Sequence, residues 1–210
     1  MKSASRKSEN ERSSGLHNPS SKRPYVYPGT NTLRNKFGLR DAQTLQALET
    51  SLSYSRLAEL DVRPLLGKFD LAHLRAIHRH IFQDVYDWAG QVRTVSIAKA
   101  NSLFALPEHI ESYAAAIFAG LERENHLRGL GRKVFIKQAA YYLGEINALH
   151  PFREGNGRAQ RAFMQHLAIQ AGYRFDWMRT GAEEVVSASI AAFDGELGGL
   201  ERLLTRCLSQ

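Results

Sequence analysis

The sequence predicts an all-α domain that carries one short β-hairpin. Apolar residues recur at intervals of three and four along most of the chain, which is the spacing of amphipathic helices. Between residues 94 and 98 the spacing changes to alternation, and a polar turn follows, as expected for a hairpin. The 210 residues, 43% of them hydrophobic and 23% charged, are enough for one buried core.

The chain begins with polar residues and enters its helical part after position 40. Residues 1–24 are rich in Ser, Lys and Arg, so we expect a flexible basic tail there and one domain over 25–210. Pro and Gly within 25–30 predict an extended arm with a turn. Asp41 is placed to cap the first helix, whose leucines share one face.

A second helix is predicted to begin after Asp70, where another acidic cap precedes a strong apolar stripe. The stripe continues through Val85, and we expect the helix to end at Ala89–Gly90. The segment 94–106 forms the predicted hairpin, and Pro107 is placed to open the next helix.

The second half of the chain is predicted to be helical apart from one loop. A helix spans about 133–149, a loop covers 153–157, and the next helix ends near Gly172. Two short helices around 183–193 and 196–208 complete the domain.

Charge and composition exclude several classes of protein. The net charge is +7, but residues 1–23 carry six cations and two acids, so most of the excess lies in the tail. We therefore expect no direct binding of nucleic acid by the core. Apolar runs fall short of the ~18 residues of a membrane span, and the chain does not open on a signal peptide. With Cys207 as its one cysteine, the chain is expected in the cytoplasm.

The candidate chemistry lies in one segment, residues 150–161, with the sequence HPFREGNGRAQR. Pro151 disfavours helical geometry at the residue before it, so His150 should stand at a helix end beside the loop. Gly155 and Gly157 permit positive φ, and successive backbone N–H groups in such a loop form a nest for anions. The helix that follows adds its positive dipole end.

The side chains of this segment suggest a reaction of a nucleotide triphosphate. Arg158 and Arg161 are spaced to share one helix face, and two guanidinium groups beside a nest suit a polyphosphate. Glu154 would repel phosphates unless a Mg²⁺ ion lay between them. His150, with an ordinary pKa near ~6.5, suits a general base for a hydroxyl nucleophile. Phe152 is apolar in a polar loop, so we expect it to anchor the loop in the core.

These twelve residues match the signature of the Fic family, His-x-Phe-x-(Asp/Glu)-Gly-Asn-Gly-Arg-x-x-Arg. The similarity extends over most of residues 25–205, including the arm at 27–38 and the stretch at 85–90. The chain resembles the compact toxin-type members, which occur in bacteria beside a small antitoxin. The resemblance implies a Fic-type helical bundle whose hairpin is a flap over the active site.

The resemblance also implies a reaction, the transfer of AMP from ATP to a Tyr, Ser or Thr hydroxyl of a target protein. By match to the motif, His150 would deprotonate that hydroxyl, and Glu154 would hold Mg²⁺ between the α- and β-phosphates. The residues implied to bind the nucleotide phosphates are Gly155, Asn156, Gly157, Arg158 and Arg161. The phosphate-transferring branch of the family carries Lys at the position of Gly157, so glycine favours AMP transfer.

Partners are implied in the same way. The flap would bind the target segment by strand pairing, through Ser96, Ile97, Ala98, Lys99, Ala100 and Asn101. Toxin-type relatives modify the ATPase subunits of DNA gyrase and topoisomerase IV, which are the expected targets. Residues 5–10 match the family's inhibitory pattern, (Ser/Thr)-x-x-x-Glu-(Gly/Asn), but they lack an apolar stripe. We therefore expect the inhibitory helix to come from a separate antitoxin.

Other interpretations remain open from the sequence. A Fic-type enzyme could use another nucleotide donor or remove AMP from a modified target, and a basic nucleic-acid-binding module would show steeply salt-dependent binding. His73, His78 and His80 lie on one predicted helix, but their spacing does not suit a shared metal ion, and we interpret them as structural. Cys207 is expected to be a buried apolar residue.

Overall fold

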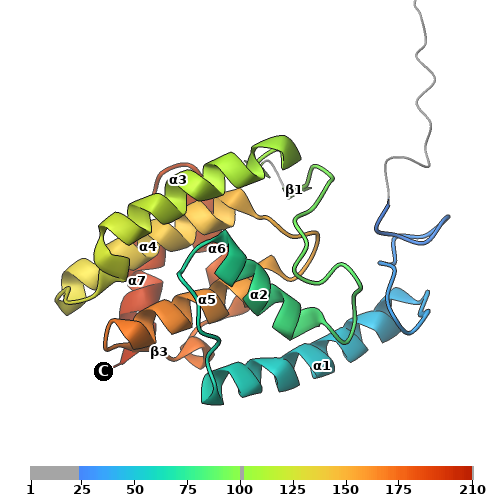
Figure 1. The fold of residues 1–210 in the computed structure, drawn as a ribbon, viewed down its shortest axis with the longest axis horizontal. Helices are drawn as coiled ribbons and strands as arrows, with labels where there is room; N and C mark the ends of the chain where they lie inside the picture. Colours follow the sequence, from blue (N-terminus) through green and yellow to red (C-terminus); the bar gives the residue numbers. More distant parts are fainter. Residues whose placement is uncertain (1–23, 100–101, 210) are drawn as a thin grey trace, which may run out of the picture.

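The computed structural model describes residues 24–99 and 102–209, and its described part is a bundle of seven α-helices (Figure 1). In this bundle α4 packs against α3, α5, α6 and α7, while α2 packs against α1, α3 and α5. The helices are α1 (Ala42–Val62), α2 (Leu71–Phe82), α3 (Ile110–Arg123), α4 (Arg132–Leu149), α5 (Asn156–Gln170), α6 (Ala182–Phe193) and α7 (Gly198–Cys207). Within the described ranges, no helix is long and apolar enough to cross a membrane.

The first two helices begin where their acidic caps predict. The carboxylate of Asp41 accepts the backbone N–H of Thr44 at 2.8 Å, and that of Asp70 accepts the N–H of His73 at 2.8 Å. Each cap satisfies one of the N–H groups that a helix leaves unpaired at its start. The Pro107 turn is a 3-10 helix, Pro107–His109, which leads directly into α3.

The second helix is shorter than the sequence predicts. It ends at Phe82 and not at Ala89–Gly90, because residues 83–90 turn back along the helix. The backbone N–H of Gly90 donates to His78 Nδ1 at 2.8 Å, and the Gly90 carbonyl accepts Arg75 Nε at 2.9 Å. Gly90 has a φ of +79°, which few other residues adopt, so it permits this return. Val85 is fully buried, but it lies in the turn.

Two short antiparallel pairs complete the fold. The predicted hairpin consists of β1 (Ala98–Lys99) and β2 (Ser102–Leu103), with Ala98 opposite Leu103. A second pair, β3 (Arg174–Phe175) with β4 (Leu208–Ser209), was not predicted, because two-residue strands are too short to show alternation. The last helix consequently ends at Cys207, one residue before its predicted end.

The helix after the candidate loop is the most enclosed of the bundle. Both neighbours α2 and α4 pack on α5, and its buried residues include Phe163, Met164 and Leu167 but also the polar Gln160, Gln165 and His166. A helix that is buried on most of its surface is held by packing from several directions. The loop at its start is therefore fixed to the core of the molecule.

Candidate active site

His150 follows the last residue of α4 in a left-handed conformation. Its φ is +43° and its ψ is +60°, and its backbone N–H closes the helix by donating to the Ile146 carbonyl at 3.2 Å. The imidazole Nδ1 lies 3.2 Å from the Asn147 carbonyl, and the ring stacks on Phe104 with a centroid distance of 3.7 Å. Because a carbonyl only accepts, Nδ1 carries the proton in this contact, which leaves the lone pair of the neutral ring on Nε2.

The loop after His150 closes on itself through one buried amide. Asn156 is 3% exposed; its Oδ1 accepts the Phe152 N–H at 2.9 Å, and its Nδ2 donates to the Phe152 carbonyl at 2.7 Å. The Asn156 side chain therefore shapes the loop from within, and both ends of its amide are bound to the backbone of Phe152. Phe152 is 1% exposed and stacks on His78 with a centroid distance of 3.8 Å.

The two glycines of the motif differ in conformation. Gly155 has a φ of +80°, and a Cβ built on it would lie 2.3 Å from the Phe82 ring, so both the backbone and the space require glycine. Gly157 lies inside α5, where its φ is not positive, and a Cβ there would meet Arg161 Nη1 at 3.4 Å. The first turn of α5 thus begins at a glycine nest, as anion sites at helix N-termini do.

Arg158 reaches from α5 to α1. It pairs with the carboxylate of Glu49, and its Nη1 donates to Ser53 Oγ at 2.9 Å. Its guanidinium lies over the Phe82 ring, 4.6 Å from the centroid. The Glu49 carboxylate also accepts the Tyr86 hydroxyl, and burial followed by the Glu49 charge raises the pKa of that phenol. Sequence reasoning missed Glu49, Ser53 and Tyr86, since nothing in the motif points to α1.

Arg161 lies one turn further along α5 and is partly buried. Burial, and to a smaller extent the charge of Arg158, lowers the pKa of its guanidinium. Within residues 24–99 and 102–209, no carboxylate comes within ion-pair distance of it. A desolvated cation without an anionic neighbour is favourable only when an anion binds, so Arg161 suits a phosphate.

Glu154 stands at the mouth of the loop with 46% of its side chain exposed. Its Oε1 accepts the N–H of Gly155 at 2.9 Å and lies 3.9 Å from Arg158 Nη2. The described residues contain no group of three or more His, Cys, Asp or Glu side chains that could hold a metal ion. A cation at Glu154 would therefore take this one carboxylate from the protein and its other ligands from phosphate and water.

His78 supports the loop from beneath. It is fully buried; its Nδ1 accepts the Gly90 N–H, and its Nε2 lies 2.9 Å from the Glu154 carbonyl. The first contact places the proton on Nε2, which then donates to Glu154. Burial lowers the pKa of His78 to about 4. The ring is thus a neutral structural group, and its hydrogen bonds join α2 to the loop that follows His150.

The hairpin lies beside the end of α4. The Ala105 N–H donates to the Ala148 carbonyl at 3.1 Å, and the Phe104 N–H donates to the Ile97 carbonyl at 3.3 Å. Of the predicted docking residues, the backbone at 96–99 is described, and Ala100 and Asn101 lie outside the described residues. The described part of the flap is therefore adjacent to His150, through the stacked ring of Phe104.

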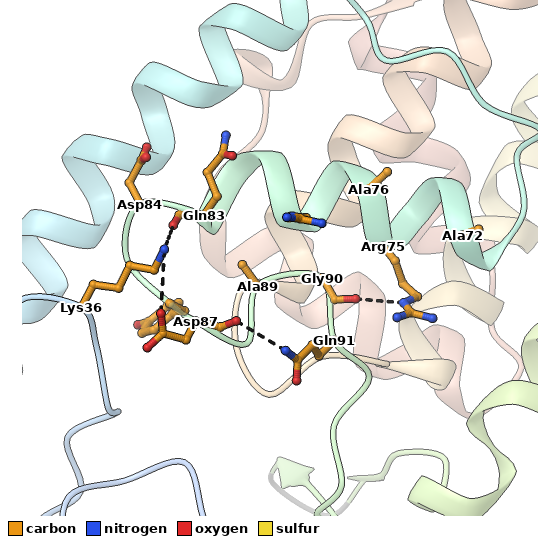
Figure 2. Close-up of a pocket in the computed structure, with 12 residues that line it drawn as sticks. Lys36, Ala72, Arg75, Ala76, Gln83, Asp84, Asp87, Ala89, Gly90 and Gln91 are labelled. Atoms are coloured by element: carbon orange, nitrogen blue, oxygen red, sulfur yellow. Dashed lines mark hydrogen bonds and ion pairs between the residues drawn. The ribbon is translucent and has the colours of Figure 1, made fainter.

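A cavity of about 1090 Å³ opens from the loop between α1, α5 and α6. Glu49, Glu154, Arg158 and Arg161 line its polar end, whereas apolar residues such as Trp177 and Val185 line the remainder. A second cavity of about 730 Å³ lies along α2 and the turn after it, and the described motif and flap residues do not line it (Figure 2). The first cavity is therefore the candidate nucleotide site.

Comparison with known proteins identifies the family of the chain. Residues 68–168 match the model of the Fic/DOC family. The probable protein adenylyltransferase Fic of Salmonella typhimurium is 38% identical over 187 residues, which is 89% of this chain and 92% of that protein. The chain belongs to the Fic/DOC family. Its Fic region is also similar to protein adenylyltransferase VbhT of Bartonella schoenbuchensis, with 46% identity over 187 residues.

The match to VbhT covers 89% of this chain but only 39% of that protein, so the chain spans about two fifths of that relative. Among solved structures, BepC of Bartonella tribocorum with bound AMPPNP has a TM-score of 0.84 and 27% identity. The structural match covers 90% of this chain and 97% of the BepC chain. The helical bundle with its flap is thus a Fic fold, as the motif implied.

Proposed function

We propose that this chain is a protein adenylyltransferase, which transfers AMP from ATP to a side-chain hydroxyl of a target protein. The observation that carries the proposal is the junction of α4 and α5. There His150 directly follows the end of α4, and α5 begins at the glycine nest. Arg158 and Arg161 lie on α5. Relatives named protein adenylyltransferases, and an ATP analogue bound to BepC, support the same reaction.

The chemistry follows from the residues at this junction. The lone pair of His150 Nε2 takes the proton of the target hydroxyl as that oxygen attacks the α-phosphorus. The bond from the α-phosphorus to the bridging oxygen breaks, and pyrophosphate leaves with the electron pair. Backbone N–H groups at the start of α5 and the two arginines bind the phosphate oxygens and stabilise their charge.

Magnesium is part of this proposal through Glu154. Its carboxylate is half-exposed beside the nest, and one carboxylate together with substrate phosphates is the usual protein contribution to a Mg²⁺ site. The ion would neutralise the charge that develops on the leaving group. We expect Glu154→Gln to weaken binding of ATP in magnesium buffer, whereas binding without divalent cation should strengthen, because the carboxylate that repels the phosphates is removed.

The proposal is tested with ATP labelled at either end. Wild-type protein incubated with a bacterial lysate should transfer label from the α-phosphate, and His150→Ala should lose transfer at least a hundredfold. His150→Ala should still bind ATP with its affinity unchanged within twofold, because the phosphate contacts remain. Label that enters protein from the γ-phosphate would contradict AMP transfer. The rate of label transfer from ATP is also compared with the rates from GTP and UTP. A faster transfer from either would mean that this nucleotide, and not ATP, is the donor.

The target protein and the regulator of the enzyme are two further parts of the proposal. We propose the ATPase subunits of DNA gyrase and topoisomerase IV as targets, and a separate antitoxin whose glutamate pairs with Arg161 as the regulator. The absence of a described carboxylate at Arg161 supports a site for such a glutamate. The inhibitory pattern at residues 5–10 lies outside the described residues. Mass spectrometry of the labelled lysate proteins identifies the target, and deletion of residues 1–20 should leave the rate unchanged.

A further inference from the structure

Arg93 is a buried cation between the second helix and the hairpin. It is 1% exposed, which is rare for arginine, and burial lowers the pKa of its guanidinium. Within the described residues no carboxylate pairs with it. A buried charge is costly unless its donors are satisfied, so the partners of this guanidinium indicate what it stabilises.

The guanidinium donates to three backbone carbonyls from three different segments. Its Nε donates to the His150 carbonyl at 2.8 Å, its Nη1 donates to the Val95 carbonyl at 2.8 Å, and its Nη2 donates to the Ala105 carbonyl. Val95 and Ala105 lie at the two bases of the hairpin, and His150 is the proposed catalytic base. One side chain therefore connects both arms of the flap to the catalytic residue.

The hairpin depends on such outside contacts for its position. Each strand has two residues, and isolated two-stranded hairpins are marginal in water. Arginine suits the task because its planar group holds several donors in fixed directions, which the single nitrogen of lysine does not. His150 itself has further support, since its N–H binds Ile146 and the backbone N–H of Arg93 donates to the Pro151 carbonyl at 2.9 Å.

We propose that Arg93 is a positioning residue that fixes the register of the flap relative to His150 and so sets the affinity for the protein target. The inference rests on the proposed function, in which the target segment pairs with the hairpin as an added strand. A displaced flap would no longer align its strand edge with the target segment, so main-chain pairing, which supplies the affinity in such added-strand complexes, would weaken. Nucleotide binding would not depend on Arg93.

The test compares Arg93→Lys with wild type and with Arg75→Lys. Arg75 is a matched control, since it is exposed on α2 and donates to the Gly90 carbonyl at 2.9 Å without contacting the hairpin (Figure 2). The substrate is the lysate protein that wild type labels most strongly, after purification. In Arg93→Lys we expect the KM for this protein to rise at least tenfold with a smaller fall in kcat. The Kd for ATP should stay within twofold, and Arg75→Lys should match wild type.

The outcomes separate the inference from the function on which it rests. Wild type that labels no protein would overturn the proposed function. Wild type that labels its target, together with an Arg93→Lys variant whose KM is unchanged, would overturn only the positioning role. A variant that loses ATP affinity and target affinity to the same extent would show a general structural role and would also overturn it.

A second measurement uses the wild-type chain and does not depend on the folding of a variant. The Nε proton of Arg93 should exchange with water as slowly as the core amides of α4, because it is buried and donated to His150. Addition of the target protein should shift its NMR resonance, and addition of ATP alone should not. Exchange as fast as that of the Arg75 Nε proton, or a shift with ATP alone, would overturn the proposal.

Discussion

The side chains of the candidate site are held by residues that lie far away in the sequence. Glu49 and Ser53 contact Arg158 from α1, and His78 donates to the loop carbonyl of Glu154 from α2. These supporting residues have no place in the motif, yet they contact its arginine and its loop directly. Substitutions at the supports should therefore change ligand binding and stability in ways that the motif alone does not predict.

Glu49 gives the first prediction. Glu49→Gln keeps the size of the side chain but removes a charge that is paired with Arg158 in a mostly buried position. We expect the free energy of unfolding to fall by roughly 1–3 kcal/mol, the cost of weakening hydrogen bonds between charged groups. The affinity for ATP should rise, because Arg158 then lacks an internal anion. Calorimetric titration of ATP and urea unfolding measure the two effects.

Glu59→Gln on the same helix is the matched control. Glu59 is half-exposed and pairs with Arg56 at 2.9 Å, and exposed pairs contribute little. Its substitution should change neither ATP affinity nor stability beyond about 1 kcal/mol. A lower ATP affinity in Glu49→Gln would show that Glu49 orients Arg158 for the phosphate instead of competing with it.

Gly155 gives a second prediction. Gly155→Ala would place a methyl group 2.3 Å from the Phe82 ring at a φ of +80°. We expect a loss of roughly 2–4 kcal/mol in the free energy of unfolding, from backbone strain and overpacking together. Gly29→Ala separates the two causes, because Gly29 has a φ of +74° and open space around it. It should lose about 1 kcal/mol in urea unfolding, and equal losses in both variants would contradict the steric argument.

Among the helices, the contact of α2 with α5 contains buried histidines. His73 stacks on His166 with a centroid distance of 5.8 Å, and His78 lies five positions after His73 on α2. Burial lowers the pKa of His166 and of His78 to about 4, from an ordinary value of 6.5. Burial also lowers the pKa of His73, so all three rings are neutral in the folded protein at pH 7, and charging them would require water to enter the bundle.

This interface predicts a pH dependence of stability. Between pH 6.5 and about 4 the unfolded chain binds protons that the folded chain does not, so stability falls as the pH falls through this window. His78 and His166 each contribute roughly 3 kcal/mol over the full window, and the contribution is fully present above the unfolded pKa. Urea unfolding at pH 7, 6 and 5 measures it. His166→Gln should flatten the profile, and a stability independent of pH would contradict the buried neutral state.

The sequence predicted the helices well because their signals are local. Asp41 and Asp70 mark helix starts, Pro151 marks the end of α4, and apolar stripes give the faces. It failed at Phe82, where the turn back along α2 depends on the tertiary contact of His78 with Gly90. It also missed β3 and β4, whose pairing joins residues more than thirty positions apart in two-residue strands.

For the candidate site, the sequence predicted one segment but not the distant residues that contact it. The motif names residues that are contiguous in sequence, and the structure places them around one loop. Glu49, Ser53 and Arg93 were not predictable, because isolated polar residues in a helix or loop show no pattern that reveals their distant partners. The inward turn of the Asn156 amide was missed for a similar reason, since its partners are backbone groups of Phe152.

For the molecule as a whole, Cys207 gives a prediction about cooperative unfolding. It is fully buried at the end of α7, burial raises the pKa of its thiol, and its carbonyl accepts the N–H of Asp176. A thiol reagent should therefore react with Cys207 of the native protein only as fast as the domain unfolds. As a control, the reaction should be immediate in about 6 M guanidinium, where the protein is fully unfolded. Complete reaction of the native protein within minutes would contradict a single cooperative core.

The ion pair of Arg158 with Glu49 has a consequence for how the enzyme is made. Its partners are 109 positions apart in the chain, so the pair forms only after α5 has been synthesised and has packed beside α1. A nascent chain that ends just after α4 already contains His150, but it lacks the residues that we propose bind the phosphates. In the proposed mechanism, catalytic competence therefore arises only after the bundle has closed, and incomplete chains have no activity to be restrained.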